Sequence, residues 1–353
     1  MSTLQLSLAI AGVLLLIAVG LHSVWSSRKQ QPKRPTPGTP SAVGKEPSAG
    51  SQEPVLQDER QEPAFDSELA ELQSMTLLEK KPGLDPLIDV IAPIAVESPV
   101  SGEAALSAMP GTRRAGSKPF AVEGLRADTG EWELPAPGQR YSAFQAGVQL
   151  ANRTGALNQI EFSEFVIKAQ AFADAVGGEP EFPDMLEEVN RARELDHFAS
   201  AHDAQLGFTV RAARTAWSPG YVQQSAARQG FVPGAMPGRM VLPAVQAGRA
   251  PILGLSFDTQ AAMADEPEQT ALREFSLSLD VPQVARSEQP FARMCEAAIA
   301  LAASMDGIII DDDGNPIRAE GMESIHADLE GLYDTLDGRD LSAGSVAGRR
   351  LFS

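Results

Sequence analysis

The chain has 353 residues and a formal net charge of −18. So acidic a chain is poorly suited to the phosphate backbone of nucleic acids, which excludes nucleic acid as the main partner. Its single cysteine, Cys295, excludes an intramolecular disulfide and fits a reducing compartment. The length leaves room for two ordinary domains beyond an N-terminal anchor.

Residues 6–25 read LSLAIAGVLLLIAVGLHSVW and carry no charge over 20 positions. At about 1.5 Å per residue, a helix of this length spans roughly 30 Å, the thickness of the hydrocarbon core of a bilayer. We therefore predict a transmembrane anchor over residues 1–27. A cleaved signal peptide is the alternative, but Met1–Gln5 has no basic residue and bulky side chains stand at the far end.

Four basic residues follow this segment directly, at Arg28, Lys29, Lys33 and Arg34. Such residues mark the cytoplasmic flank of a span and attract anionic lipid headgroups. The predicted topology is single-pass, with the N-terminus outside and the rest of the chain in the cytoplasm. Lipid contact is expected through residues 6–25 and this basic flank.

Residues 28–83 are predicted to be a disordered linker rich in proline, glutamine and acidic residues. Seven prolines lie between Pro32 and Pro63, and apolar side chains are too few to offset the entropy of ordering. A flexible chain of this length reaches about 30–40 Å, and proline extends that reach. Phe65, Leu69 and Leu72 are spaced for one short amphipathic turn or two.

From residue 84 onward the sequence shows a tandem pattern at a constant offset of 129 residues. Val148 and Leu150 match Leu277 and Leu279, Phe162 matches Phe291, and Gly178 matches Gly307. In each copy an alternating strand leads into a helix with one apolar stripe, which is predicted to end at the glycine. We expect a diverged first module over residues 84–204 and a second module over residues 205–337.

The second copy predicts the fold more clearly than the first. Its order is strand, helix, two or three strands, helix, strand, helix, with strands expected at residues 206–210, 252–257, 275–279 and 307–310. This order indicates an α+β fold: an antiparallel sheet with helices on one face, of the split β-α-β, ferredoxin-like kind. The other face is then open to solvent or to a partner. Residues 338–353 are predicted to be a flexible tail.

Signals of catalysis are poor, and we predict no catalytic, cofactor-binding or metal-binding residues. The stretch at residues 311–315, DDDGN, is similar to the start of a calcium loop, but Pro316 and Met322 stand where that loop needs glycine and glutamate. His197 and His202 are five residues apart and do not share a helix face. Cys295 falls on an apolar helix face and is interpreted as a core residue.

Three stretches of the second module resemble the ZipA family of bacterial cell-division proteins. They are FSLSLDVP at residues 275–282, FARMCEAAIALA at 291–302 and MDGIIIDDD at 305–313, with Gly230 and Phe231 in addition. The resemblance is best over residues 206–336. The anchor, the basic flank and the Pro/Gln-rich linker also match the layout of that family.

The resemblance implies a membrane anchor at the division site of the bacterial inner membrane, with the N-terminus periplasmic. The C-terminal domain of the family holds the C-terminal tail of FtsZ in a shallow groove on its open sheet face. That groove places peptide-contacting residues, by position, at Thr209, Arg211, Met236, Met240, Phe257, Ser276 and Ser278. The groove of the family is strongly apolar, whereas Thr209, Ser276 and Ser278 are polar.

Two other functions fit parts of the same pattern. One is a membrane-anchored cytoplasmic scaffold for another envelope-assembly complex, which would use the same anchor and linker. The other is an enzyme on a ferredoxin-like sheet, which would need titratable groups that converge in a cleft. The leading hypothesis is the tether for FtsZ, without enzymatic activity and without a cofactor.

Overall fold

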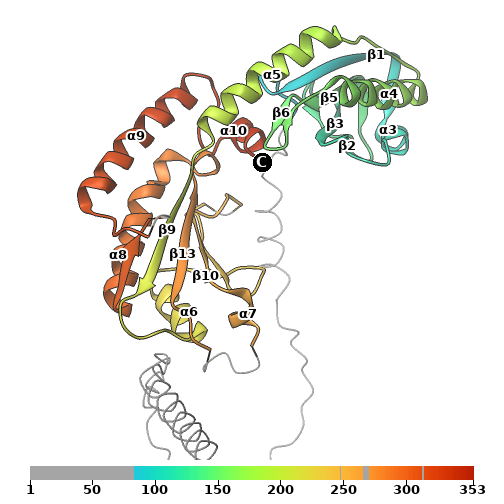
Figure 1. Ribbon diagram of the computed structural model, residues 1–353. Coiled ribbons are helices and arrows are strands. Elements are labelled where there is room, and N and C mark those ends of the chain that lie inside the picture. Colours follow the sequence, from blue (N-terminus) through green and yellow to red (C-terminus); the bar gives the residue numbers. More distant parts are fainter. Residues whose placement is uncertain (1–82, 247, 265–269, 312–313) are drawn as a thin grey trace, which may run out of the picture.

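The structure is a computed structural model that describes residues 83–246, 248–264, 270–311 and 314–353. In this part of the chain, two six-stranded antiparallel sheets are linked by a long helix (Figure 1). The expectation of an α+β fold with antiparallel sheets is confirmed. The anchor expected over residues 1–27 and nearly all of the linker expected over residues 28–83 lie outside the described residues. No helix among those described has both the length and the apolar character to cross a bilayer.

The first unit extends from strand β1 to helix α5. Its elements are β1 (Asp89–Ser101), α3 (Gly102–Ala108), β2 (Arg114–Ala115), β3 (Lys118–Arg126), β4 (Trp132–Glu133), β5 (Arg140–Gln149), β6 (Ala151–Asn152), β7 (Gly155–Ala156), α4 (Gln159–Val176), β8 (Gly178–Pro180) and α5 (Met185–His202). The strand order is β2-β3-β5-β1-β8, with β4 beside β3, while β6 and β7 form a separate hairpin.

The second unit begins at strand β9, directly after helix α5. Its elements are β9 (Gln205–Ala212), α6 (Pro219–Arg228), β10 (Val232–Pro233), β11 (Arg239–Leu242), β12 (Leu253–Ser256), α7 (Thr259–Ala262), β13 (Glu274–Asp280), the 3-10 turns η1 (Val281–Gln283) and η2 (Arg286–Glu288), α8 (Pro290–Met305), β14 (Gly307–Ile310) and α9 (Ala319–Asp337). The strand order is β10-β11-β12-β13-β9-β14.

The two sheets share one order of elements. In each sheet, the first strand of the unit, β1 or β9, is an inner strand. The strands that follow it in the chain lie on one side of it, and the last strand, β8 or β14, forms the edge on its other side. Strand β5, helix α4 and strand β8 thus correspond to β13, α8 and β14. The offset of 129 residues places Phe162 and Phe291 in the first turns of α4 and α8, and Gly178 and Gly307 at the starts of β8 and β14.

The two paired glycines have a different role from the expected one. Helices α4 and α8 end at Val176 and Met305, and the left-handed residues Gly177 and Asp306 cap them at φ 69° and 57°. Gly178 instead opens the returning strand, where a Cβ atom would lie 2.7 Å from Cγ2 of Ile94. A side chain there would push β8 away from β1, so the glycine permits the close approach of these strands.

Each unit has its own aromatic core between its sheet and helices. In the first unit, Phe144 of β5 meets Phe172 of α4 edge-on, with ring centroids 5.2 Å apart. In the second, Trp217 packs on Phe275 of β13 and donates a hydrogen bond from Nε1 to the carbonyl of Met305 at 2.8 Å. Because buried indole N–H groups need such a partner, this bond fixes the end of α8 against the loop before α6.

The C-terminal segment differs from the expected flexible tail. It contains helix α10 (Val346–Leu351), which lies between the two units near the marked C-terminus (Figure 1). Leu351 and Phe352 are 1% exposed, and Gln283 of η1 donates to the carbonyl of Phe352 at 2.7 Å. The segment is ordered because it fills the junction between the units, a contact that its local composition does not reveal.

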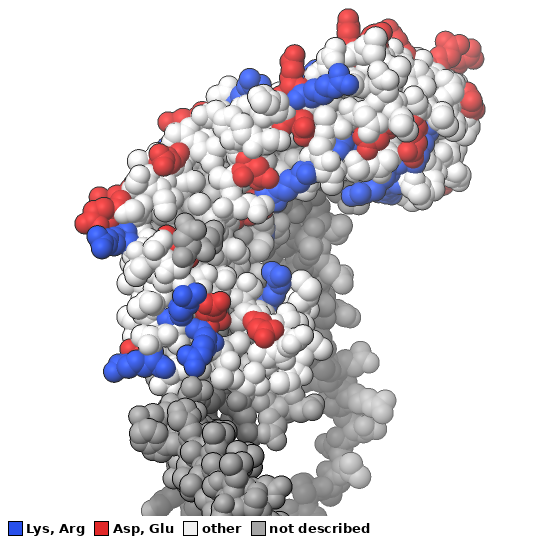
Figure 2. Space-filling model, in the orientation of Figure 1, with Lys and Arg blue, Asp and Glu red and all other residues white. Residues whose placement is uncertain are grey.

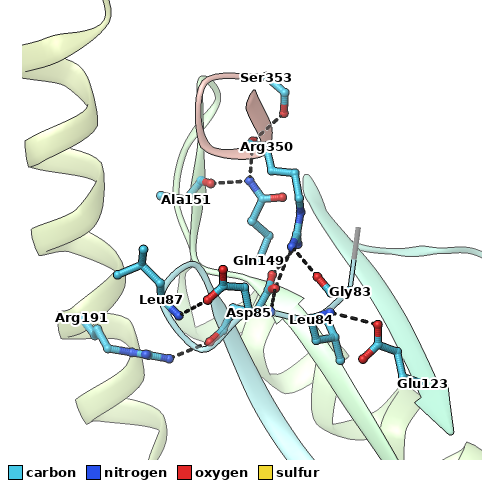
Figure 3. A network of polar contacts seen from close by, with 11 residues as sticks. Gly83, Leu84, Asp85, Leu87, Glu123, Gln149, Ala151, Arg191, Arg350 and Ser353 are labelled. Carbon is cyan, nitrogen blue, oxygen red and sulfur yellow. Dashed lines mark hydrogen bonds and ion pairs between the residues drawn. The ribbon is translucent and has the colours of Figure 1, made fainter. Parts of the chain in front are cut away.

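Arg350 of this segment is bound to the start of the first unit (Figure 3). Its guanidinium donates to both carboxylate oxygens of Asp89, at 2.6 and 2.9 Å, and to the carbonyl of Gly83 at 3.2 Å. The carbonyl of Arg350 accepts a hydrogen bond from the side chain of Gln149 at 2.8 Å. The last residues of the chain therefore hold the point where the described chain begins.

A second cross-link is Arg153, which lies in the turn between β6 and β7. It forms two forked ion pairs, one with Asp203 after α5 and one with Asp280 at the end of β13, with all four N–O distances between 2.7 and 2.8 Å. The pKa of Arg153 is raised by its hydrogen bonds to Asp203 and then to Asp280. Arg153 and α10 together fix how the two sheets meet.

Candidate peptide-binding face

One face of the second sheet lacks the apolar packing that covers the other. Phe275, Leu277 and Leu279 of β13 are buried and point toward helix α8, whereas Ser276 and Ser278 point the opposite way. The alternation arises because successive side chains of a strand leave on opposite sides. We call the side that carries Ser276 and Ser278 the open face.

The middle of the open face is made of small residues. Across the strands, Ser276 pairs with Thr209 and with Ser256, while Ser278 pairs with Gly207 and with Gly254. The hydroxyls of Thr209 and Ser276 lie 3.4 Å apart. A Cβ atom on Gly254 would come within 2.6 Å of Oγ of Ser278, so a larger residue would not fit here without displacing Ser278. With glycine, no side chain projects from this position of the face. The result is a shallow polar floor that a peptide backbone can approach closely.

The border of this floor on the β14 side is apolar. Ile308 pairs with Arg211 and is 44% exposed, while Ile310 pairs with Thr209 and is covered where it bridges to Pro316. An exposed isoleucine next to a polar floor offers apolar contact to a bound side chain. After Ile310, the backbone N–H of Asn315 donates to Oδ1 of Asp311 at 2.7 Å, and Pro316 lies beside Ile310.

Basic side chains gather at one end of the open face. Figure 2 shows them over the end of β9 and the start of β13, below a larger area without charge. Arg211 forms an exposed ion pair with Glu274 at 3.0 Å, and Arg239 shares the cross-strand row of Ser256 and Ser276. Since exposed ion pairs contribute little to stability, Arg211 can exchange Glu274 for an acidic group of a ligand at small cost.

The structure divides the seven expected groove residues into three groups. Thr209, Arg211, Ser276 and Ser278 lie together on the open face. Met236 lies in the turn before β11 and is 58% exposed. Met240 and Phe257 are 3% and 7% exposed and belong to the hydrophobic core, because Met240 pairs with Leu255 in the buried row of the sheet.

Sequence reasoning missed five residues of the face: Gly207, Arg239, Gly254, Ser256 and Ile308. The alternation in β12 was the signal that could have found two of them, because Leu253 and Leu255 are buried while Gly254 and Ser256 face outward. Ile308 sits in a continuous apolar run, in which alternation cannot distinguish the two faces.

Among the described residues, the candidates for metal binding and for nucleophilic chemistry can be placed relative to this face. Among the residues that the structure describes, no three His, Cys, Asp or Glu side chains are grouped so as to hold a metal ion. Cys295 of α8 is half-buried, and burial followed by the charge of Glu296 raises the pKa of its thiol. Such a thiol is a poor nucleophile at neutral pH.

A comparison with protein families finds one match, to the C-terminal FtsZ-binding domain of ZipA, over residues 260–328. The matched segment covers α7, β13, α8, β14 and the first half of α9, and it includes Ser276 and Ser278 of the open face. A search of curated proteins found no match. The matched family is a protein-binding domain and not an enzyme. The resemblance to the ZipA family expected from the sequence is therefore confirmed, through residues 260–328 of the second unit.

Proposed function

We propose that the second unit binds the C-terminal tail of FtsZ on its open face, and that the chain thereby tethers the division ring to the inner membrane. The observation that carries this proposal is the uncovered sheet face. Its strands β13 and β14 lie within the segment matched to an FtsZ-binding domain, while β9, β11 and β12 lie before that segment. An exposed sheet face without helix cover leaves its side chains free to contact a partner.

The chemistry of the face indicates how a tail would be held. Gly207, Gly254 and the serines allow the peptide backbone close to the floor, where Thr209, Ser256 and Ser276 offer hydroxyls as hydrogen-bond partners. Ile308 offers apolar contact, and Arg211 and Arg239 favour acidic side chains. Since polar floors give less affinity than buried apolar anchors, binding of a single tail should be weak.

A tether works with weak single contacts because FtsZ filaments present many tails. The anchor expected at residues 6–25 confines many copies of the chain to one surface, and the linker expected at residues 28–83 supplies reach. Binding of one tail then raises the effective concentration for the next, so that weak contacts add by avidity.

The test is retention of FtsZ by the full chain and by its Ser278→Glu variant. Ser278 is exposed, so this change should leave the fold intact while it puts bulk and negative charge in the middle of the floor. We expect at least a tenfold loss of affinity, about 1.4 kcal/mol. The matched control is Ser163→Glu on the exposed side of α4, which should bind as the unaltered chain does.

Retention of FtsZ that is unchanged in Ser278→Glu would contradict the use of the open face. Failure of the unaltered chain to retain FtsZ, together with capture of another envelope-assembly protein, would favour the alternative function as a scaffold.

A further inference from the structure

The first unit contains an apolar pocket that the proposed function does not use. It has a volume of about 200 Å³ and opens beside strand β3. Its lining includes Met109, Pro110, Arg113, Phe120, Val122 and Leu134. A volume of this size accepts one or two large aliphatic or aromatic side chains, but it is below that of a typical small-molecule site.

The pocket lies at a gap in the sheet edge. On the side of β3 away from β5, β2 pairs with Lys118 and Pro119, and β4 pairs with Gly124 and Leu125. Among the described strand pairings, residues 121–123 have a neighbour on the β5 side alone. An uncovered edge with an apolar pocket is a typical place for a segment of chain to dock.

Arg113 lines the pocket, and Arg114 follows it directly in the chain at the start of β2. Arg113 and Arg114 are exposed, and neither has an ion-pair partner in the part of the chain that the structure describes. Nζ of Lys168 holds this turn in place by donating to the carbonyl of Arg114 and to Oγ1 of Thr112, each at 2.5 Å. In a chain of net charge −18, two unpaired arginines beside an apolar pocket favour an acidic, apolar ligand.

The chain outside the structure ends at strand β3, on the opposite face of the sheet from the side chains of Phe120 and Val122 that line the pocket, so the preceding residues need to pass only the edge of β3 to reach it. Leu84 donates its backbone N–H to Oε1 of Glu123 at 3.0 Å, and Glu123 directly follows Val122 of the pocket (Figure 3). The side chain of Leu84 rests over Gly147, where a Cβ atom would lie 2.4 Å from Cδ2 of the leucine. The preceding residues therefore start next to β3, held there by Glu123 and by Arg350.

The chain itself contains a segment of the required chemistry. Residues 64–73 read AFDSELAELQ, with three large apolar side chains at Phe65, Leu69 and Leu72, three acidic residues and no basic ones. The apolar residues recur at the spacing of one helix face, which leaves the acidic side chains at its flanks. Nine residues separate this segment from Gly83, enough for about 30 Å of extended chain.

We propose that residues 64–73 dock in cis on the β3 pocket, with apolar side chains in the pocket and acidic ones toward Arg113 and Arg114. Because the linker is covalently attached a few residues away, its effective concentration at the pocket is in the millimolar range, so a weak contact suffices. Docking shortens the free linker to residues 28–63 and so reduces the distance over which the body can move from its anchor.

The test is hydrogen exchange of the full chain in detergent, compared with two variants. In the unaltered chain, we expect amides of residues 64–73 to exchange at least tenfold more slowly than those of residues 40–60. Phe65→Ser combined with Leu69→Ser should remove this protection and speed exchange at Ala121–Glu123. These changes lie outside both folded units, so they cannot act by unfolding them. Val55→Ser with Leu56→Ser is the matched control, and it should change nothing.

Reversing the charges of two arginines tests whether they attract the acidic side chains of residues 64–73. Arg113→Glu with Arg114→Glu should abolish the protection of residues 64–73, whereas Arg193→Glu on the exposed side of α5 should preserve it. Protection that grows with protein concentration would overturn the proposal in favour of docking between two chains. Protection of the pocket that appears only when FtsZ is added would overturn it in favour of a partner in trans. Equal exchange along the whole linker would also overturn it.

Discussion

At the scale of single residues, Asp89 shows what a buried charge requires. Its side chain is fully buried, with a forked bond to Arg350 and a further hydrogen bond from the amide of Asp85 at 2.8 Å. Burial raises the pKa of Asp89, and the hydrogen bond and charge of Arg350 oppose that rise without cancelling it. A carboxylate so placed depends on its one cation, because an uncompensated buried charge is strongly destabilising.

Replacement of Arg350 by alanine should therefore lower the free energy of unfolding by about 3 kcal/mol near pH 8. The raised pKa means that the folded chain holds the Asp89 proton more tightly than the unfolded chain. The contribution of Asp89 to stability thus falls as the pH rises from the pKa of Asp89 in the unfolded chain to its higher pKa in the folded chain. Without Arg350, the pKa of Asp89 in the folded chain rises further. Asp89 then takes up a proton as the pH falls toward 5.5, so the loss in the free energy of unfolding should be smaller there than near pH 8.

Denaturation with urea at pH 5.5 and at pH 8 measures this effect. Arg193→Ala, on the exposed side of α5, is the control and should change stability by less than about 0.5 kcal/mol. A loss that is the same at both pH values would show that Asp89 does not take up a proton when its cation is removed.

At the scale of elements, local sequence patterns predicted the main strands and helices, whereas helix α10 and the burial of two expected groove residues depend on tertiary contacts. The alternation in β13 and the apolar stripes of α4 and α8 are local, so those elements were predicted from the sequence. Helix α10 has six residues with Gly348 inside it, and no isolated helix of that length is stable. It exists because Leu351 and Phe352 are buried at the junction. Met240 and Phe257 were assigned to the groove by position in a family, whereas strand register buries them in the core.

Replacement of Leu351 and Phe352 by alanine tests whether α10 is a structural element. Both side chains are 1% exposed, and large-to-small changes at such sites typically cost about 3 kcal/mol each. We expect a lower melting temperature and faster hydrogen exchange in the β6–β7 hairpin and in η1, which α10 contacts. A flexible tail would instead leave the melting temperature and both exchange rates unchanged.

At the scale of the whole molecule, two units of the same strand order differ on their open faces. The face of the second unit is floored by small residues without cover, whereas Leu84 lies on Gly147 and bonds Glu123 on the corresponding face of the first. The chain thus covers part of the first face with its own residues. This asymmetry favours one ligand-binding face per chain.

We therefore expect the full chain to bind one FtsZ tail peptide, and not two. Titration calorimetry of the peptide into the full chain should give a stoichiometry near one, and Ser278→Glu should remove that binding. A stoichiometry near two, with one site left in Ser278→Glu, would show that the first unit also binds FtsZ.

The most direct measurement is a hydrogen-exchange footprint of the FtsZ tail peptide on the full chain. Binding on the open face predicts slower exchange in residues 205–211, 253–256 and 274–280, the strands that carry the small-residue floor. Helices α8 and α9, on the opposite side of the sheet, should exchange as before. A footprint confined to those helices or to the first unit, at a peptide concentration that saturates binding, would contradict the account.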